Sequence, residues 1–175
     1  LLAARCLFVA MLVLAVARPV STGSTGSSST PVDHVLVIDN TASIPRWVTA
    51  SAGLLADAAY YYLYTSSISA YADSSKPNAD ETEPTGEISA EDEAKVLTNK
   101  DITGENYGPL KVRCEEEARK AFTDERSCVV RPGLIVGPGD YSDRFSYWPV
   151  RVFKGGEVMA PGNPTDPLQF IDSTD

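Results

Sequence analysis

Tyr107 and Lys111 stand four residues apart in the segment "TGENYGPLKVRCEEEARKAF" and could form a proton-transfer pair. Residues four apart share one face of a helix, so the Lys111 ammonium can lie near the Tyr107 phenol. A nearby cation favours the phenolate and lowers the pKa of a tyrosine from its usual value of about 10. Such a tyrosine could exchange protons near neutral pH. The same pair is also a common neighbour pair on ordinary helix surfaces.

The segment that carries this pair is predicted to be helical despite its Gly-Pro sequence. Asn106 is expected to cap the start of the helix. Pro109 then falls in the first turn, where a missing N–H costs little because those amides have no partner within the helix.

Three short apolar runs are predicted to be strands, at residues 32–39, 61–67 and 127–131. Helical patterns lie between the first two runs and before the third, which predicts the α/β class with a parallel sheet covered on both faces. Ligands of such sheets bind beyond the carboxyl ends of the strands. The polar residues expected there are Asp39, Asn40, Thr41, Ser66, Ser67, Ser69 and the Pro132-Gly133 turn.

The remaining elements follow from capping and breaking signals. Ser43 is a possible N-cap of the helix that follows the first strand, with Pro45 in its first turn. A helix is expected at about residues 143–154, interrupted by Pro149 and stopped by Gly155 and Gly156. Residues 72–102 form a long polar loop rich in Asp and Glu, and a Pro/Gly-rich turn follows the third strand.

Composition and charge exclude several functions. The 175 residues are 43% hydrophobic and 22% charged, which is ordinary for a globular domain. The net charge of −9, without a basic run, argues against a nucleic-acid binder. Cys6, Cys114 and Cys128 form no CxxC pair, and His34 is the single histidine, so neither a metal site nor a disulfide framework is expected.

The first thirty residues have a different composition from the rest. Arg5, an apolar run over residues 6–14 and Ala15-Val16-Ala17 resemble a secretory or organelle-targeting leader, and the apolar run is too short to favour a membrane span. A Ser/Thr/Gly-rich linker follows at residues 21–30. The alternative is that this stretch is a foreign or wrongly joined segment that does not belong with the rest of the chain.

Four segments in order resemble one family. The segments "YLYTSSISAYAD", "YGPLK", "RPGLIVGPGD" and "FIDSTD" are similar to the extended short-chain dehydrogenase/reductases, in particular the NAD-dependent epimerase/dehydratase group. The resemblance covers about residues 32–175. It implies a partial Rossmann-like parallel sheet and NAD or NADP as cofactor, with hydride exchanged at a hydroxyl or carbonyl of a sugar-like or other small substrate.

The resemblance also implies roles for individual residues. Ser67, four residues before Tyr71, would hold the reacting substrate oxygen, although the register could be off by one, since Ser66 and Ser69 are also strand-end hydrogen bonders. Tyr107 would be the general acid/base, and Lys111 would lower its pKa and bind the nicotinamide ribose. The expected cofactor-binding residues are Asn40, Thr41, Lys111, Pro132 and Gly133.

Ser69, Arg144 and Arg151 are the candidates for substrate binding. Arg144, Trp148 and Arg151 are spaced to share a helix face and could reach an anionic substrate. A surface helix with Trp148 packed in the core is an equal alternative. Residues 72–102 lengthen the interval from Ser67 to Tyr107, either as a solvated surface or as a lid.

The chain departs from the family pattern in two places. Gly23 and Gly26 imitate the spacing of a glycine-rich phosphate-binding turn, but Pro31 follows and no helix can form behind them. The N-terminal strands of the family and their glycine motif are therefore expected to be missing. Leu134 stands where nucleotide-sugar epimerases usually carry asparagine, which argues against a nucleotide-sugar substrate.

These expectations divide the chain into three parts. Residues 1–30 are leader and linker, 31–140 the later part of a Rossmann-like NAD-binding domain, and 141–175 the beginning of a substrate-binding region. The expected partners are a small-molecule substrate and a second copy of the chain, with no nucleic acid and no stable membrane span. The family implies a cytoplasmic protein, and a true leader would imply a secreted or organelle-targeted one. The alternative function is a non-catalytic family remnant or interaction module that binds no cofactor.

Overall fold

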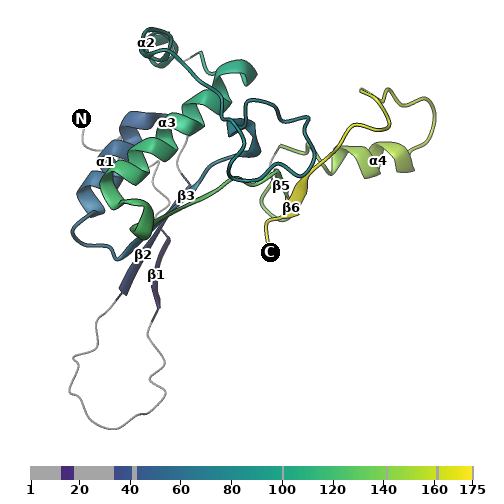
Figure 1. The fold of residues 1–175 in the computed structure, drawn as a ribbon. Helices are drawn as coiled ribbons and strands as arrows, with labels where there is room; N and C mark the ends of the chain where they lie inside the picture. The colour runs from purple at the N-terminus through teal and green to yellow at the C-terminus, as the bar shows by residue number, and fades with distance from the viewer. Residues whose placement is uncertain are drawn as a thin grey trace.

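A computed structural model describes residues 13–17, 34–40, 43–99, 101–140, 142–160 and 162–174. Its main sheet has the order β1-β2-β3-β4, shown in Figure 1. The strands are β1 (Val13–Ala17), β2 (His34–Asp39), β3 (Tyr61–Thr65) and β4 (Ser127–Val130). β2, β3 and β4 are parallel, whereas β1 pairs antiparallel with β2. The predicted α/β class and the three predicted strands are confirmed, but the sheet is mixed rather than fully parallel.

β1 comes from the apolar segment that the sequence places in a leader. Its five residues pair with five of the six residues of β2, from Val13 opposite Ile38 to Ala17 opposite His34. An edge strand of this kind supplies partners for backbone groups that β2 would otherwise leave unpaired. Within the structure, this part of residues 1–30 belongs to the sheet.

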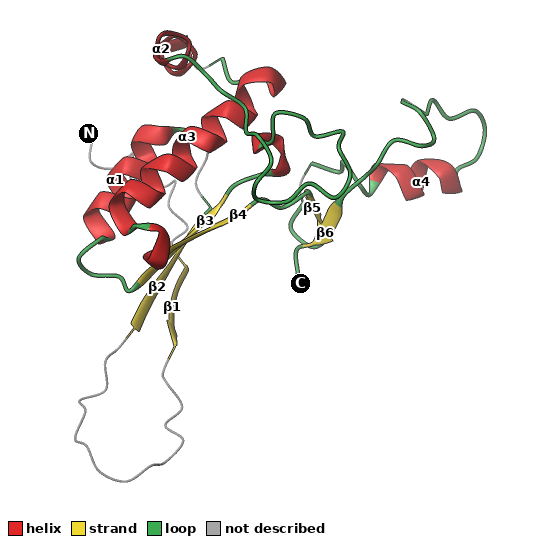
Figure 2. Cartoon of the chain, in the orientation of Figure 1, coloured by secondary structure: helices red, strands yellow, loops and turns green. Residues whose placement is uncertain are grey.

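Two helices lie side by side on one face of the sheet, α1 (Pro45–Leu55) and α3 (Gly104–Phe122), as Figure 2 shows. Each connects consecutive parallel strands, and strand order advances in one direction from β2 to β4. Two right-handed crossovers in one direction place their helices on one face. The expected cover on both faces is therefore not met within the part of the chain that the structure describes.

The core lies between this face and the two helices. The Tyr62 and Phe122 rings stack with centroids 4.7 Å apart. Along β3 the alternate residues Tyr62 and Tyr64 are fully buried, while the other three residues of the strand are only half-buried. The other members of the core are Val37, Val48, Ala52, Ala59, Cys114 and Ala118.

Both main helices begin differently from the prediction. α1 is preceded by Ile44, and Ser43 lies one residue further out and is buried. Pro45 has no N–H, so the first turn has one amide fewer to satisfy. α3 begins at Gly104, and the Asn106 side chain accepts a hydrogen bond from the Thr103 backbone N–H at 2.9 Å. Asn106 is thus inside the helix, at its third position (N3), where its side chain completes a capping box.

As a consequence, Pro109 lies in the second turn of α3 rather than in the first. The carbonyl that would have paired with its missing N–H belongs to Glu105, which is exposed and can be hydrated. The proline ring packs against Gly86, where an added Cβ would lie 3.1 Å from it. The helix therefore continues through Gly108 and Pro109 to Phe122.

The segment 72–102 contains structure that was predicted to be loop. Helix α2 spans Ala90–Asn99, and the Ser89 hydroxyl accepts a hydrogen bond from the Asp92 N–H at 3.1 Å. Tyr71 and Thr85 form an isolated antiparallel bridge. The first turn of α2 holds three acidic residues, whose negative charge stabilises the positive N-terminal end of the helix dipole.

The C-terminal part holds a second, two-stranded parallel sheet. β5 (Leu134–Val136), predicted as turn, pairs with β6 (Phe170–Asp172). Helix α4 is shorter than predicted, Tyr147–Phe153, with Pro149 in its first turn, where proline is tolerated. Gly155 and Gly156 have φ values of 67° and 79° and end it.

Candidate functional site

A cavity of about 500 Å³ lies at the carboxyl ends of β2 and β3, where an α/β sheet usually binds its ligand. We refer to it as the strand-end cavity. The register places Asp39 opposite Tyr64 and Thr65 opposite Val130, so β2, β3 and β4 end at the same edge. The residues that line the cavity are Asn40, Ser43, Thr65, Ser66, Tyr107, Lys111 and Ile135.

Lys111 presents its ammonium group to the end of β3. Its Nζ donates a hydrogen bond to the Thr65 carbonyl at 2.8 Å and lies 4.6 Å from the centroid of the Tyr64 ring. The residue is 4% exposed. Burial lowers the pKa of Lys111, while Cys114, Asp39 and Glu115 act in the opposite direction. The helix thus holds a cation at a fixed place in the wall of the cavity.

Tyr107 lines the same cavity one turn before Lys111. The two residues are on the first half of α3, and their spacing of four brings both side chains to one side of the helix. Lys111 donates to the Thr65 carbonyl and not to the Tyr107 phenol. The phenol and the ammonium therefore face the same space from separate positions.

Ser67 lies in the turn that follows β3. It is half-buried and precedes the short helix η2 (Ile68–Ala70), and its Oγ accepts a hydrogen bond from the Ser69 N–H at 3.1 Å. No hydrogen bond donated by the Ser67 hydroxyl is seen within the described residues, and Ser67 is not among the residues that line the strand-end cavity. Ser69 itself is exposed.

Gly108 brings this turn against α3 directly beside Tyr107. A Cβ added at Gly108 would lie 1.8 Å from the Ser69 carbonyl oxygen. Only glycine permits this approach of the two backbones. The structure therefore places the Ser67 turn and Tyr107 in adjacent positions. The sequence carried this signal in the Tyr-Gly-Pro order, but Gly108 was not predicted as a site residue.

The predicted cofactor-binding residues divide into two groups. Asn40 lines the strand-end cavity and accepts a hydrogen bond from the Thr65 hydroxyl at 2.5 Å. Pro132 and Gly133 are outside the lining: the Pro132 carbonyl accepts from the Ile68 N–H at 3.0 Å, and an added Cβ at Gly133 would lie 2.5 Å from the Gln169 carbonyl. Thr41 lies outside the described residues.

Asp39, expected at the cofactor edge, is used in packing. It is 4% exposed, and its carboxylate accepts hydrogen bonds from the Tyr62 hydroxyl and, at 3.0 Å, from the Ser51 hydroxyl. Burial, and then the bond to Asp39, raises the pKa of Tyr62 far above its usual range. This polar group ties β2 to β3 and α1 beneath the site.

The structure separates the two arginines predicted to bind substrate. Arg144 precedes α4, and its Nε donates to the Ser142 hydroxyl at 2.7 Å. Arg151 is within α4, and its guanidinium donates to the Gly155 carbonyl at 2.7 Å and to the Glu157 carbonyl. The predicted helix face shared by Arg144, Trp148 and Arg151 is wrong because the helix begins only at Tyr147. Trp148 is 38% exposed and so is not a core residue.

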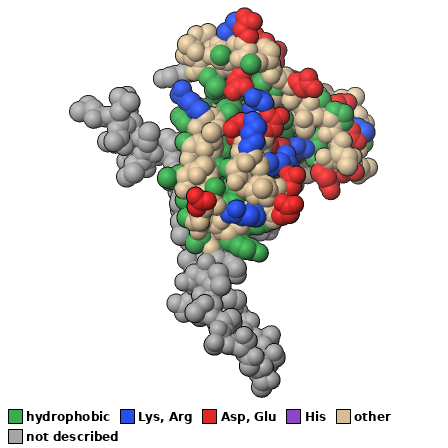
Figure 3. All heavy atoms as spheres, turned by 60° about the vertical axis from the view of Figure 1, so that its left-hand side comes forward, with side chains coloured by type: hydrophobic (Ala, Val, Ile, Leu, Met, Phe, Trp, Pro, Cys, Tyr) green, Lys and Arg blue, Asp and Glu red, His purple; other side chains and the backbone are tan. Residues whose placement is uncertain are grey.

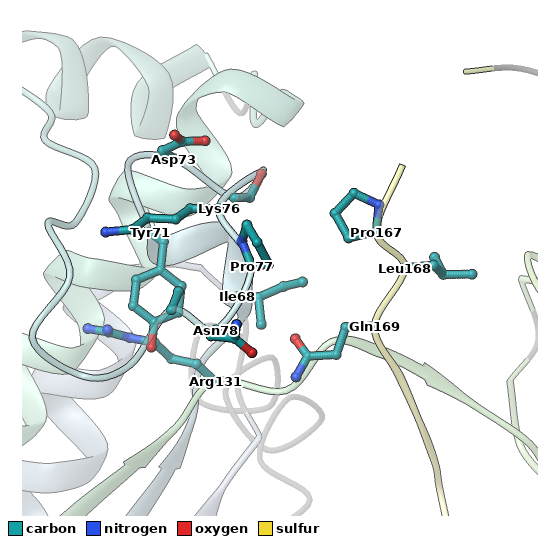
Figure 4. A pocket seen from close by; sticks show the side chains of 12 residues that line it. Ile68, Tyr71, Asp73, Lys76, Pro77, Asn78, Arg131, Pro167, Leu168 and Gln169 are labelled. Carbon is teal, nitrogen blue, oxygen red and sulfur yellow. The ribbon is translucent and has the colours of Figure 1, made fainter. Parts of the chain in front are cut away.

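A second cavity, of about 450 Å³, lies between the loop after η2 and the segment 167–169; we refer to it as the loop cavity. Figure 4 shows Tyr71 and Arg131 on one side, with Gln169 reaching from the opposite segment toward the side that carries Asn78. The Arg131 guanidinium lies 4.7 Å from the centroid of the Tyr71 ring. The sequence gave no indication of this cavity, because it forms between segments almost a hundred residues apart.

Charges on the outer surface are mixed. In Figure 3 the basic and acidic side chains are interleaved over the centre of the view. Helix α3 forms ion pairs that bring opposite charges together, such as Arg113 with Glu93 and Lys120 with Glu117. This face therefore carries no basic patch that would attract a polyanion. Among the described residues, no helix combines the length and the apolar character needed to cross a bilayer.

Comparison of the sequence with models of known protein families gives no match, and no curated protein matches it. The family resemblance drawn from the four segments stays a prediction. The fold is compatible with it: β2, β3 and β4 with α1 and α3 form two consecutive βαβ units, the kind of unit from which a Rossmann-like sheet is built.

Proposed function

We propose that this chain is an NAD-dependent oxidoreductase of the epimerase/dehydratase type, acting on a hydroxyl or carbonyl of a sugar-like or other small substrate. One observation carries the proposal. Tyr107 and Lys111 face a single cavity at the carboxyl end of β3, and the Ser67 turn packs beside Tyr107. A tyrosine and a fixed cation at this edge, with a serine hydroxyl in the adjacent turn, are suited to moving the proton of a substrate alcohol.

Each residue has a distinct role in this proposal. Tyr107 takes the proton of the substrate hydroxyl on oxidation and returns it on reduction. Ser67 donates its hydroxyl hydrogen to the same substrate oxygen and orients it. Lys111, fixed by the Thr65 carbonyl, supplies positive charge near the phenol and a donor to the cofactor ribose. A dinucleotide held beside these residues would supply the acceptor and donor of the hydride.

The described residues fit one end of the cofactor. The strand-end cavity is large enough for a nicotinamide riboside. Its wall includes Asn40, Tyr107 and Lys111 and offers both hydrogen-bond donors and acceptors. No G-x-G-x-x-G turn lies within the ranges that the structure describes. The proposal therefore assigns the nicotinamide end to the strand-end cavity and assigns no residue to the pyrophosphate. It names NAD as the cofactor, with NADP as the alternative.

The test is calorimetric titration of NADH and of NADPH into the folded chain and two variants. Lys111→Met removes the cation and keeps the apolar stem, and Lys120→Met removes an exposed lysine of the same helix. We expect saturable binding by wild type and Lys120→Met, weakened about tenfold or more by Lys111→Met, as for loss of a hydrogen bond from a charged donor. Absence of binding to a folded wild-type chain would overturn the proposal.

A second candidate function is supported by the C-terminal part. Large apolar side chains are exposed there, among them Val152, Phe153, Met159 and Leu168. Apolar surface of this kind is typical of a contact with another protein. We accordingly keep a non-catalytic interaction module as the alternative, in which Tyr107→Phe would change no measurable property of the folded chain.

A further inference from the structure

Glu115 is a buried carboxylate that the proposed chemistry does not use. It lies on α3 one turn after Lys111 and is 1% exposed. Its oxygens accept hydrogen bonds from the Arg131 guanidinium, from Nε at 3.0 Å and from Nη2 at 2.7 Å, and from the Ser66 hydroxyl. Arg119 adds a longer ion-pair contact at 3.8 Å. A buried charge is retained only where such partners replace its hydration.

Two partners of Glu115 connect it to the two ends of one segment, residues 66–71. Ser66 directly precedes Ser67, and Arg131 stacks on the ring of Tyr71, four residues after Ser67. Glu115 therefore contacts the start of the 66–71 segment directly and its end through Arg131. Backbone bonds hold the same segment to the strand beside it, from the Ser66 N–H to the Val130 carbonyl at 2.7 Å.

Glu115 also bonds to residues that line both cavities. Ser66 lines the strand-end cavity, whereas Tyr71 and Arg131 line the loop cavity. The segment that carries Ser67 runs between them, so a shift of this segment would alter both cavities. Both sets of contacts meet at one carboxylate on the helix that also supplies Tyr107 and Lys111. Helix, strand end and serine turn are thus held in one fixed relation.

We propose that Glu115 is the positioning residue of this site: through Ser66 and Arg131 it holds the 66–71 segment, and with it the Ser67 hydroxyl, in register with Tyr107. The chemical role of Ser67 rests on the proposed function, but the positioning itself does not. Glu115 does not line either cavity and touches no substrate. Its effect is on the geometry of the turn.

The experiment is amide hydrogen exchange of the full chain read by mass spectrometry, which needs no ligand. In Glu115→Gln we expect exchange of the 66–71 amides to rise about tenfold, as for loss of a hydrogen bond to a charged group. Exchange of Tyr62 to Tyr64, in the core of β3, should rise only by the factor that the loss of global stability of the variant accounts for. Glu116→Gln, the adjacent residue on the outer side of α3, is the matched control and should leave both regions unchanged.

Two further variants separate positioning from stability. Glu115→Gln leaves the Arg131 charge buried without its counter-ion, so it also lowers the melting temperature. The double variant Glu115→Gln with Arg131→Met removes both charges. It should recover most of the melting temperature but not the protection of residues 66–71. If Glu115→Gln does not fold, Ser66→Ala removes one arm alone and should raise exchange at residues 66–68.

Unchanged protection of residues 66–71 in Glu115→Gln would overturn the inference. Recovery of that protection together with the melting temperature in the double variant would also overturn it, because the role would then be general stability. NADH titration of wild type, done separately, reports on the proposed function. A chain that binds no NADH but loses protection at 66–71 in Glu115→Gln would refute the function and keep the positioning role.

Discussion

The sheet with its two helices and the C-terminal segment differ in how they use apolar residues. In the first region, Tyr62, Tyr64 and Phe122 are fully buried. In the described residues from 132 onward, Val136 is the only buried residue, and Phe153 is 92% exposed. The proposed catalytic residues all belong to the packed region, whereas two of the three substrate candidates belong to the exposed one. Stability and proposed chemistry thus reside in the same part of the chain.

Paired phenylalanine truncations test this difference most directly. Phe122→Ala removes a buried ring that stacks on Tyr62, which should cost about 3 to 5 kcal/mol of unfolding free energy. Phe153→Ala removes an exposed ring and should change that free energy by less than about 0.5 kcal/mol. Urea unfolding followed by circular dichroism measures both. Similar losses in the two variants would show that the C-terminal segment is packed as tightly as the core.

Two glycine substitutions sharpen the comparison within the packed region. Gly108→Ala places a Cβ against the Ser69 carbonyl and should cost about 1 to 3 kcal/mol, because a backbone must move. Gly104→Ala adds a Cβ at the start of the same helix, where it would meet nothing within 4 Å. This variant should instead stabilise the folded chain by about 0.4 to 1 kcal/mol. Thermal unfolding measures whether each substitution lowers or raises the stability. A neutral Gly108→Ala would mean that the Ser67 turn is not held against α3.

The elements that the sequence predicted are those with a local signal. β2 and β3 were identified from apolar, β-branched or aromatic runs, and α3 from its pattern around Tyr107 and Lys111. The Tyr107 and Lys111 side chains face one cavity because helical spacing alone requires it.

The features that the sequence did not predict depend on distant contacts or on competing signals. β5 and β6 are each three residues long and pair across more than thirty residues, and Gly and Pro around β5 indicated a turn. Helix α2 has no buried residue, so its acidic sequence resembled a loop. Glu115 is the first of three consecutive glutamates, and its burial depends on the tertiary position of Arg131, which the local sequence does not show.

The pH dependence of stability tests whether water is excluded from the part of the core that lies behind the strand-end cavity. Burial raises the pKa of the Cys114 thiol from 9.0 to about 11. The unfolded thiol ionises above pH 9 while the folded one stays protonated. Its contribution is therefore fully present below pH 9 and is lost as the pH rises toward 11. Between pH 8 and 10 the loss should be about 1.4 kcal/mol.

Urea unfolding of wild type, Cys114→Ala and Cys128→Ala at several pH values between 8 and 10 measures this slope. Cys114→Ala should lose it and Cys128→Ala should keep it. The lowered pKa of Lys111 acts in the opposite direction, since burial of its charge is relieved as the pH rises. Because Cys114 and Lys111 affect each other's pKa, the same series is also measured in a Lys111→Met background, where the Lys111 contribution is absent. An equal slope in Cys114→Ala would show that water reaches this thiol, and the region beneath the site would then resemble the exposed C-terminal segment more than the core.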